Sequence, residues 1–78
     1  MKSLKELGSY VRKRRKSLDI TQETLSQLAG SSLRSIKNLE KGTGNPTWGQ
    51  MEKTFQVLGW ELILRNRSNE EPESENPK

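Results

Sequence analysis

Residues 21–42 constrain the fold of this chain more than any other part of it. Apolar residues recur there at helical spacing in two short runs, and Gly30 separates the runs. Thr21 and Ser32 stand just before the runs, where a side-chain oxygen can accept a hydrogen bond from a first-turn amide. Gly30 and Gly42 follow the runs, and glycine readily takes the left-handed conformation that ends a helix. The segment therefore predicts two short helices joined by a tight turn.

A longer helix is predicted before this pair. It runs from Leu4 to about Lys16, and Ser3 with Glu6 has the spacing of a capping box at its start. Gly8 lies inside it and costs about 1 kcal/mol relative to Ala, so packing has to hold this helix in place.

A fourth helix is predicted after the pair. Residues 43–46 have loop composition, Thr47 with Gln50 forms a second capping box, and Gly59 ends the helix. The helical spacing of apolar residues also indicates which side chains form the core. In the three later helices we expect these residues to point inward: Leu25, Leu28, Ala29, Ile36, Leu39, Trp48, Met51, Phe55 and Leu58.

The pattern changes after the fourth helix, because residues 60–67 are rich in strand formers and too short for another helix. With no second strand in the chain, we expect this one to pair with its counterpart in a second subunit across a two-fold axis. Residues 68–78 are acidic and lack large apolar side chains, which is typical of a disordered tail. The expected organisation is a helical domain over 1–59, a dimerising strand over 60–67 and a tail over 68–78. The strand residues expected at the dimer contact are Trp60, Leu62, Ile63 and Leu64.

Charge and composition favour a small basic domain. Residues 1–67 carry 13 Lys and Arg against 6 Asp and Glu, whereas residues 68–78 carry 1 against 4. A basic body suits DNA, because each neutralised phosphate releases condensed counterions, but a soluble basic domain without such a partner would look similar. The chain contains no Cys and no His, so a second subunit is the expected source of added stability. Nothing resembles a membrane span or a signal peptide, so a cytoplasmic location is expected.

The sequence TQETLSQLAGSSLRSIKNLEKG, residues 21–42, resembles the helix-turn-helix of the Cro and phage-repressor family, also called the Xre type. The usual form is T-Q-x-x-L-A-x-x-x-G-(V/I)-S-x-x-x-I-x-x-(L/I)-E-x-G, and the resemblance reaches from about Leu7 to Leu58. Ser26 and Ser31 depart from it, replacing an Ala and an apolar residue. The resemblance implies a mainly α, four-helix lambda-repressor-like domain. With the predicted strand, the expected fold is that domain followed by a short C-terminal β-strand that pairs across a homodimer.

The resemblance also implies roles for individual residues. In the family the outer face of the third helix contacts bases in the major groove, and here that face carries Leu33, Arg34, Lys37 and Asn38. Arg34 suits guanine, Asn38 suits adenine and Leu33 suits a thymine methyl group. Lys37 can reach a base or a phosphate, and Arg34 and Lys37 could also be ordinary solvated charges. Phosphate contacts are expected from Gln22, Ser32, Ser35 and Lys41, and a structural ion pair from Arg15 with Glu40.

The residue types argue against an enzyme. Without His or Cys, and with acids scattered on helix faces or in the tail, the chain offers no nucleophile with a base and no metal-ligand cluster. No cofactor and no metal are expected. The predicted function is a sequence-specific transcriptional repressor that binds a palindromic operator as a homodimer.

The ending of the chain resembles that of HipB-type antitoxins, whose paired C-terminal strands share a small sheet and whose dimer binds a HipA-type kinase toxin. That resemblance implies an antitoxin that regulates its own operon. A stand-alone repressor would have the same DNA chemistry, and gene context would separate the two. A third hypothesis is a protein-binding adaptor whose strand augments a partner sheet. It predicts little loss of function when Arg34 and Asn38 are replaced by Ala.

Overall fold

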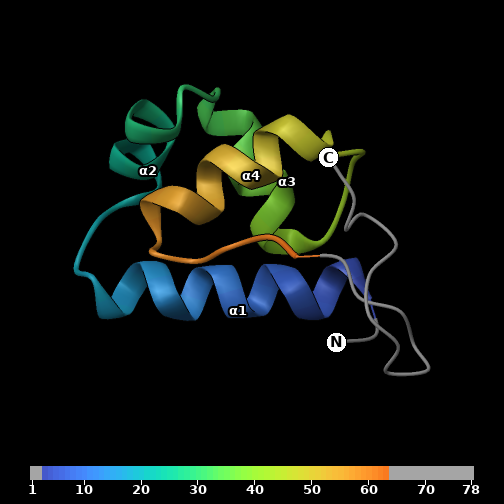
Figure 1. Cartoon of the computed structure of the whole chain (residues 1–78), viewed down its shortest axis with the longest axis horizontal. Coiled ribbons are helices and arrows are strands. Elements are labelled where there is room, and N and C mark those ends of the chain that lie inside the picture. Colours follow the sequence, from blue (N-terminus) through green and yellow to red (C-terminus); the bar gives the residue numbers. More distant parts are fainter. Residues whose placement is uncertain (1–2, 64–78) are drawn as a thin grey trace, which may run out of the picture.

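The computed structural model describes residues 3–63, which form four helices and a non-helical C-terminal segment (Figure 1). The first helix lies along one edge of the molecule, and the other three helices all lie on the same side of the first helix. None of the four is long and apolar enough to span a bilayer. This arrangement confirms the mainly α, four-helix prediction. The helices are α1 (Leu4–Ser17), α2 (Gln22–Ala29), α3 (Leu33–Lys41) and α4 (Trp48–Val57).

Local capping chemistry sets the ends of these helices. Gly30 and Gly42 end α2 and α3 in the left-handed conformation, with φ of 68° and 76°. Gln50 completes a capping box at α4 by accepting a hydrogen bond from the Thr47 amide at 3.1 Å. All of these positions are among those that the sequence predicts. Four N-cap side chains each accept a first-turn amide at 3.0–3.1 Å: Ser3, Thr21, Ser32 and Thr47.

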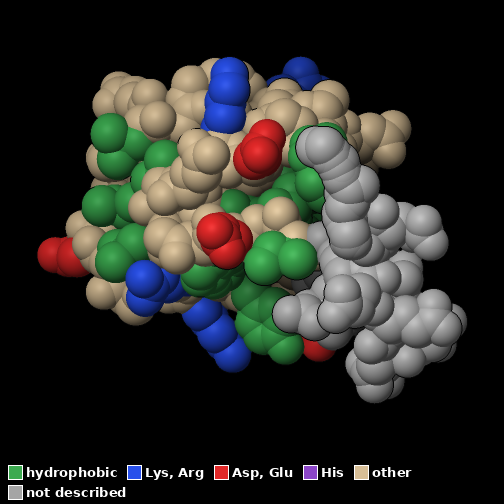
Figure 2. Space-filling view, viewed as in Figure 1, with side chains coloured by type: hydrophobic (Ala, Val, Ile, Leu, Met, Phe, Trp, Pro, Cys, Tyr) green, Lys and Arg blue, Asp and Glu red, His purple; other side chains and the backbone are tan. Residues whose placement is uncertain are grey.

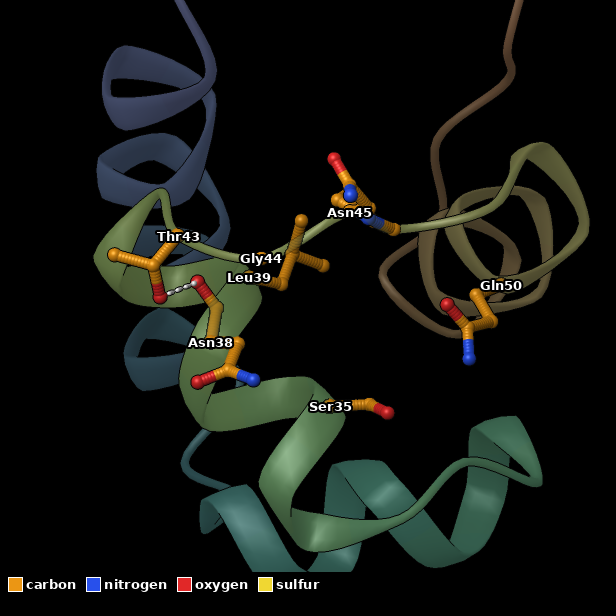
Figure 3. A pocket seen from close by; sticks show the side chains of 8 residues that line it. Ser35, Asn38, Leu39, Thr43, Gly44, Asn45 and Gln50 are labelled. Atoms are coloured by element: carbon orange, nitrogen blue, oxygen red, sulfur yellow. Dashed lines mark hydrogen bonds between the residues drawn. The ribbon is translucent and has the colours of Figure 1, made fainter.

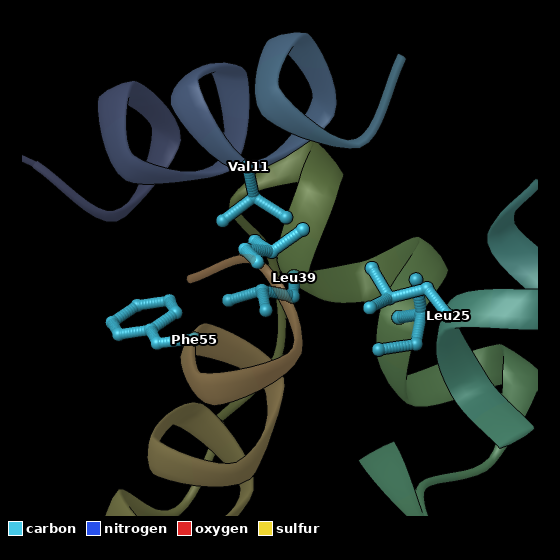
Figure 4. Packing of buried hydrophobic residues seen from close by; sticks show 6 residues of the cluster. Val11, Leu25, Leu39 and Phe55 are labelled. Carbon is cyan, nitrogen blue, oxygen red and sulfur yellow. The ribbon is translucent and has the colours of Figure 1, made fainter. Parts of the chain in front are cut away.

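One cluster of buried apolar side chains joins the four helices (Figure 4). Val11 of α1, Leu39 of α3 and Phe55 of α4 converge at its centre, and Leu25 reaches it from α2. Because every helix contributes to this cluster, the orientation of α3 depends on the packing of the whole domain. The buried members of this cluster are Val11, Leu25, Ile36, Leu39, Phe55 and Leu58.

α1 crosses α3 at Gly8, which is buried inside α1. A β-carbon at Gly8 would fall on the backbone carbonyl oxygen of Leu39 and would lie 2.6 Å from that of Glu40. The sequence requires packing to hold Gly8 in a helix. That packing is a direct contact between the backbones of α1 and α3. A hydrogen bond fixes the other end of α1, where Arg14 Nε donates to the carbonyl of Leu58 at 2.9 Å.

Two of the expected core positions are wrong, because Leu28 is 62% exposed and Trp48 is 50% exposed. On α2 the inward face is centred on Leu25 and Ala29, and Ser26 takes the place expected for Leu28. Burial of Ser26 is tolerated because its hydroxyl donates to the Glu23 carbonyl of its own helix at 2.7 Å. Trp48 is the first residue of α4, and the residues of this helix that pack in the core cluster begin at Met51.

The predicted strand falls only partly within the described residues. Residues 60–63 form no β-ladder in this single chain and run beside α1 (Figure 1). Trp60 packs edge-on against Phe55 with ring centroids 5.5 Å apart, and Leu62 also packs against the core cluster. Ile63 is 62% exposed. Leu64, the remainder of the predicted strand and the predicted acidic tail lie outside the described residues.

Candidate nucleic-acid interface

α3 buries one face and exposes the other. Ile36 and Leu39 point into the core, whereas Arg34, Lys37 and Lys41 are exposed. The other two residues expected to read bases, Leu33 and Asn38, are half-buried. All four expected base-reading residues therefore belong to a helix whose outer face is open to a ligand.

Helical geometry divides that outer face into a crest and two flanks. Successive residues are about 100° apart around a helix, so Arg34 and Lys41 lie at the crest, farthest from the buried residues. Lys37 leans toward the flank that faces α1 and the start of α2, and Asn38 leans toward the loop before α4. The two flanks have different chemistry.

The flank beside Asn38 is a small polar pocket of about 140 Å³ (Figure 3). The loop that closes it is tied to α3, because the Thr43 amide donates to the Asn38 carbonyl at 2.9 Å and the Thr43 hydroxyl donates to it at 3.4 Å. The lining of this pocket carries no charged side chain: it consists of Ser35, Asn38, Leu39, Thr43, Gly44, Asn45, Pro46 and Gln50.

The flank beside Lys37 contains a buried ion pair. Arg15 meets Glu40 through two hydrogen bonds, from Nε to Oε2 at 2.6 Å and from Nη2 to Oε1 at 3.1 Å, and the two side chains are only 9% and 4% exposed. Arg15 Nη1 also donates to the Ile20 carbonyl at 2.9 Å, and Gln22 Nε2 donates to Glu40 Oε1 at 3.0 Å. The Glu40 carboxylate thus joins α3 to α1 and α2, and the Arg15 guanidinium joins the same network to the α1–α2 loop. The structure brings together the two residues expected to pair.

The residues that form this surface lie within a match to a known protein family. A family model described as Helix-turn-helix, of the Cro and phage-repressor type, matches residues 11–59, which is more than half of the chain. The chain belongs to this family. Helix-turn-helix domains of this type are DNA-binding regulatory domains and not enzymes, so this chain is a DNA-binding regulator. No curated protein matches the chain.

In this helix-turn-helix chain, three of the four residues expected to bind phosphate make contacts within the domain. Ser32 and Ser35 hydroxyls lie 2.9 Å apart at the N-cap of α3, and Ser32 also accepts the Ser35 amide. Gln22 donates to Glu40, so its amide is held at the first turn of α2. Lys41 is exposed at the crest of α3. These side chains border the outer face of α3, as a phosphate contact requires.

The helix-turn-helix motif at residues 21–42 does not by itself indicate Arg12 or the loop at residues 43–45, which line the two flanks of α3. Arg12 belongs to the basic run at the end of α1, which its favourable position in the helix dipole already explains. In the structure Arg12 lines the same groove as Lys37 and Lys41. Only the crossing of α1 over α3 brings these residues together.

Proposed function

We propose that this chain is a sequence-specific transcriptional repressor that binds a two-fold symmetric operator as a homodimer. The observation that carries the proposal is the open outer face of α3, with Arg34 and Lys41 at its crest. A helix with its side chains is about 10–12 Å across and the major groove is about 12 Å wide, so this face can enter the groove. The buried Arg15–Glu40 pair and the Gly8 contact hold α3 rigid, which lowers the cost of ordering on binding.

The side chains on this face suit direct readout of base edges. Arg34 is exposed and can donate two hydrogen bonds to guanine O6 and N7. Asn38 can pair with adenine, and Leu33 can pack on a thymine methyl group. Half-sites about one helical turn apart are what a dimer of this type requires. Selection of bound sites from a random DNA pool would return both the half-site sequence and its spacing.

Arg34→Ala is expected to cost about 1 to 3 kcal/mol in binding to the selected operator and to relax the preference at one base pair per half-site. Lys41→Ala should weaken binding to all duplexes by a similar factor, because a phosphate contact carries no sequence information. Mobility-shift titrations on the operator and on a scrambled duplex measure both effects. Equal losses on the two duplexes would reject Arg34 as a base reader. No loss with either variant would favour the adaptor hypothesis instead.

The proposed dimer contact is an open apolar groove between α1 and the C-terminal segment. Its lining includes Leu7, Tyr10, Trp60, Leu62 and Ile63, and hydrophobic side chains gather over this part of the surface (Figure 2). Tyr10 is 46% exposed and Ile63 is 62% exposed. A domain this small gains stability from covering such a surface with a second copy. A strand formed by residues 60–67 would continue the same surface across a two-fold axis.

Ile63→Lys is expected to convert the dimer to a monomer, because it places a charge at the edge of this groove beside Lys13 and Arg14. Its thermal unfolding should remain cooperative, since Ile63 is exposed in the single chain. Light scattering measures the mass. Leu28→Lys is the matched control, because Leu28 has the same exposed fraction but lies on α2. A dimer that persists in Ile63→Lys would show that the subunits meet elsewhere.

The narrower proposal is that the chain is the antitoxin of an operon that also encodes a HipA-type kinase toxin. Its support is the short apolar segment that follows the helical domain directly, with Ile63 left exposed. The alternative is a stand-alone Xre-type regulator with the same DNA contacts. A kinase-like reading frame beside the gene, and a complex formed by the two purified products, would favour the antitoxin. A dimer that represses its promoter with no such neighbour would favour the regulator.

A further inference from the structure

The groove on the Lys37 flank carries an excess of positive charge. Its lining consists of Arg12 and Arg15 from α1, Gln22 from α2, and Lys37, Glu40 and Lys41 from α3. The carboxylate of Glu40 is already satisfied by Arg15 and Gln22. Three cations remain around it, and none of them makes a hydrogen bond or an ion pair with another residue in the range 3–63: Arg12, Lys37 and Lys41.

Three unpaired cations that line one groove from two helices favour an anion there. Like charges placed around one groove repel each other, and an anion between them removes that repulsion. A guanidinium fits a phosphate with two parallel hydrogen bonds, whereas an ammonium acts as a point charge. The groove borders the outer face of α3, and the duplex backbone flanks a helix that lies in the major groove.

We propose that this groove binds one phosphate of the DNA backbone, with Arg12 as its ligand from α1, and that Lys37 binds this phosphate rather than a base. The inference rests on the proposed function, and it adds a residue of α1 to the interface. It also makes the two flanks of α3 unequal. One flank holds its backbone strand by charge, and the other, which is lined by neutral side chains such as Asn45, holds its strand by hydrogen bonds alone.

The test measures how the affinity for a random-sequence duplex of about 20 base pairs depends on salt, by fluorescence anisotropy between about 50 and 200 mM KCl. Arg12→Ala is expected to reduce the slope of log K against log salt by about 1 per bound subunit. At about 0.1 M salt the corresponding loss of affinity is about eightfold per subunit. Arg12→Lys should restore the slope, because it keeps the charge.

Lys53→Ala is the control for loss of a charge, since Lys53 is exposed on α4 and lines neither the anion groove nor the apolar groove of the proposed dimer contact. It should leave the slope within error of the parent value. Asn45→Ala should lower affinity without changing the slope. Because Arg12 is exposed, Arg12→Ala should also keep the parent's thermal midpoint, which separates lost binding from lost folding.

Two results would overturn the inference and leave the proposed function intact. One is an unchanged slope in Arg12→Ala while Arg34→Ala still loses operator preference. The other is Lys37→Ala altering the preference at one base pair with an unchanged slope, which would make Lys37 a base reader. If the parent chain binds no duplex at moderate salt, the proposed function and this inference both fail.

Discussion

Glu40→Ala is expected to leave most of the protein molecules unfolded at room temperature. The Arg15 guanidinium is nearly inaccessible to water, and without Glu40 its only acceptor among the described residues is the Ile20 carbonyl. Removing one partner of a buried ion pair costs about 3–5 kcal/mol, because the other charge is left buried and unpaired. A core in a domain this small rarely supplies more than about 3–5 kcal/mol in total. The loss is therefore comparable to the whole stability of the fold.

Circular dichroism measures the loss in Glu40→Ala as missing helical signal at zero urea, and urea unfolding gives a midpoint for each variant that still folds. Glu40→Gln keeps an acceptor for Arg15, so its midpoint should fall less. Arg15→Met combined with Glu40→Leu should recover most of the stability, because neither charge is then stranded. Glu52→Ala, at an exposed acid on α4, is the control and should stay within about 0.5 kcal/mol of the parent. A Glu40→Ala midpoint equal to that of the control would mean that water reaches the pair in solution.

The helix ends could be predicted from the sequence because capping is local chemistry. A hydroxyl three residues before an amide, as at Ser32 and Ser35, specifies a helix start without reference to the rest of the fold. Gly30 and Gly42 specify the ends in the same way. The order of the four helices follows from these signals. The ion pair of Arg15 with Glu40 could not be predicted from local chemistry, because the two residues lie far apart in sequence. Only the family resemblance linked them.

The rotation of a short helix about its own axis could not be predicted in the same way. α2 has eight residues, and its apolar side chains are compatible with more than one inward face. Tertiary packing selects the face with Ser26, whose small side chain allows close approach, and turns Leu28 outward. The composition of the Arg12 groove is also a tertiary property, because it depends on where α1 crosses α3.

Gly8→Ala tests that crossing, and it is expected to destabilise the fold although it improves the helix. Alanine is favoured over glycine inside a helix by about 1 kcal/mol. Against this gain, the new methyl group would meet the carbonyl oxygens of Leu39 and Glu40. Overpacking costs about 1–3 kcal/mol, and more when the obstructing atoms cannot move aside. Backbone oxygens at the end of α3 cannot rotate away as a side chain can, so the clash should outweigh the gain.

Gly49→Ala is the matched control, because Gly49 lies inside α4 and a β-carbon there meets no atom within 4 Å. It should raise the urea midpoint by the equivalent of about 0.4–1 kcal/mol, because alanine lowers the conformational entropy of the unfolded chain and has a higher helix propensity than glycine. The same substitution at Gly8 should lower the midpoint by the equivalent of about 2 kcal/mol. It should also weaken operator binding, because α1 can accommodate the methyl group only by displacing the end of α3. A stabilised Gly8→Ala variant with normal DNA binding would mean that the two backbones do not touch there.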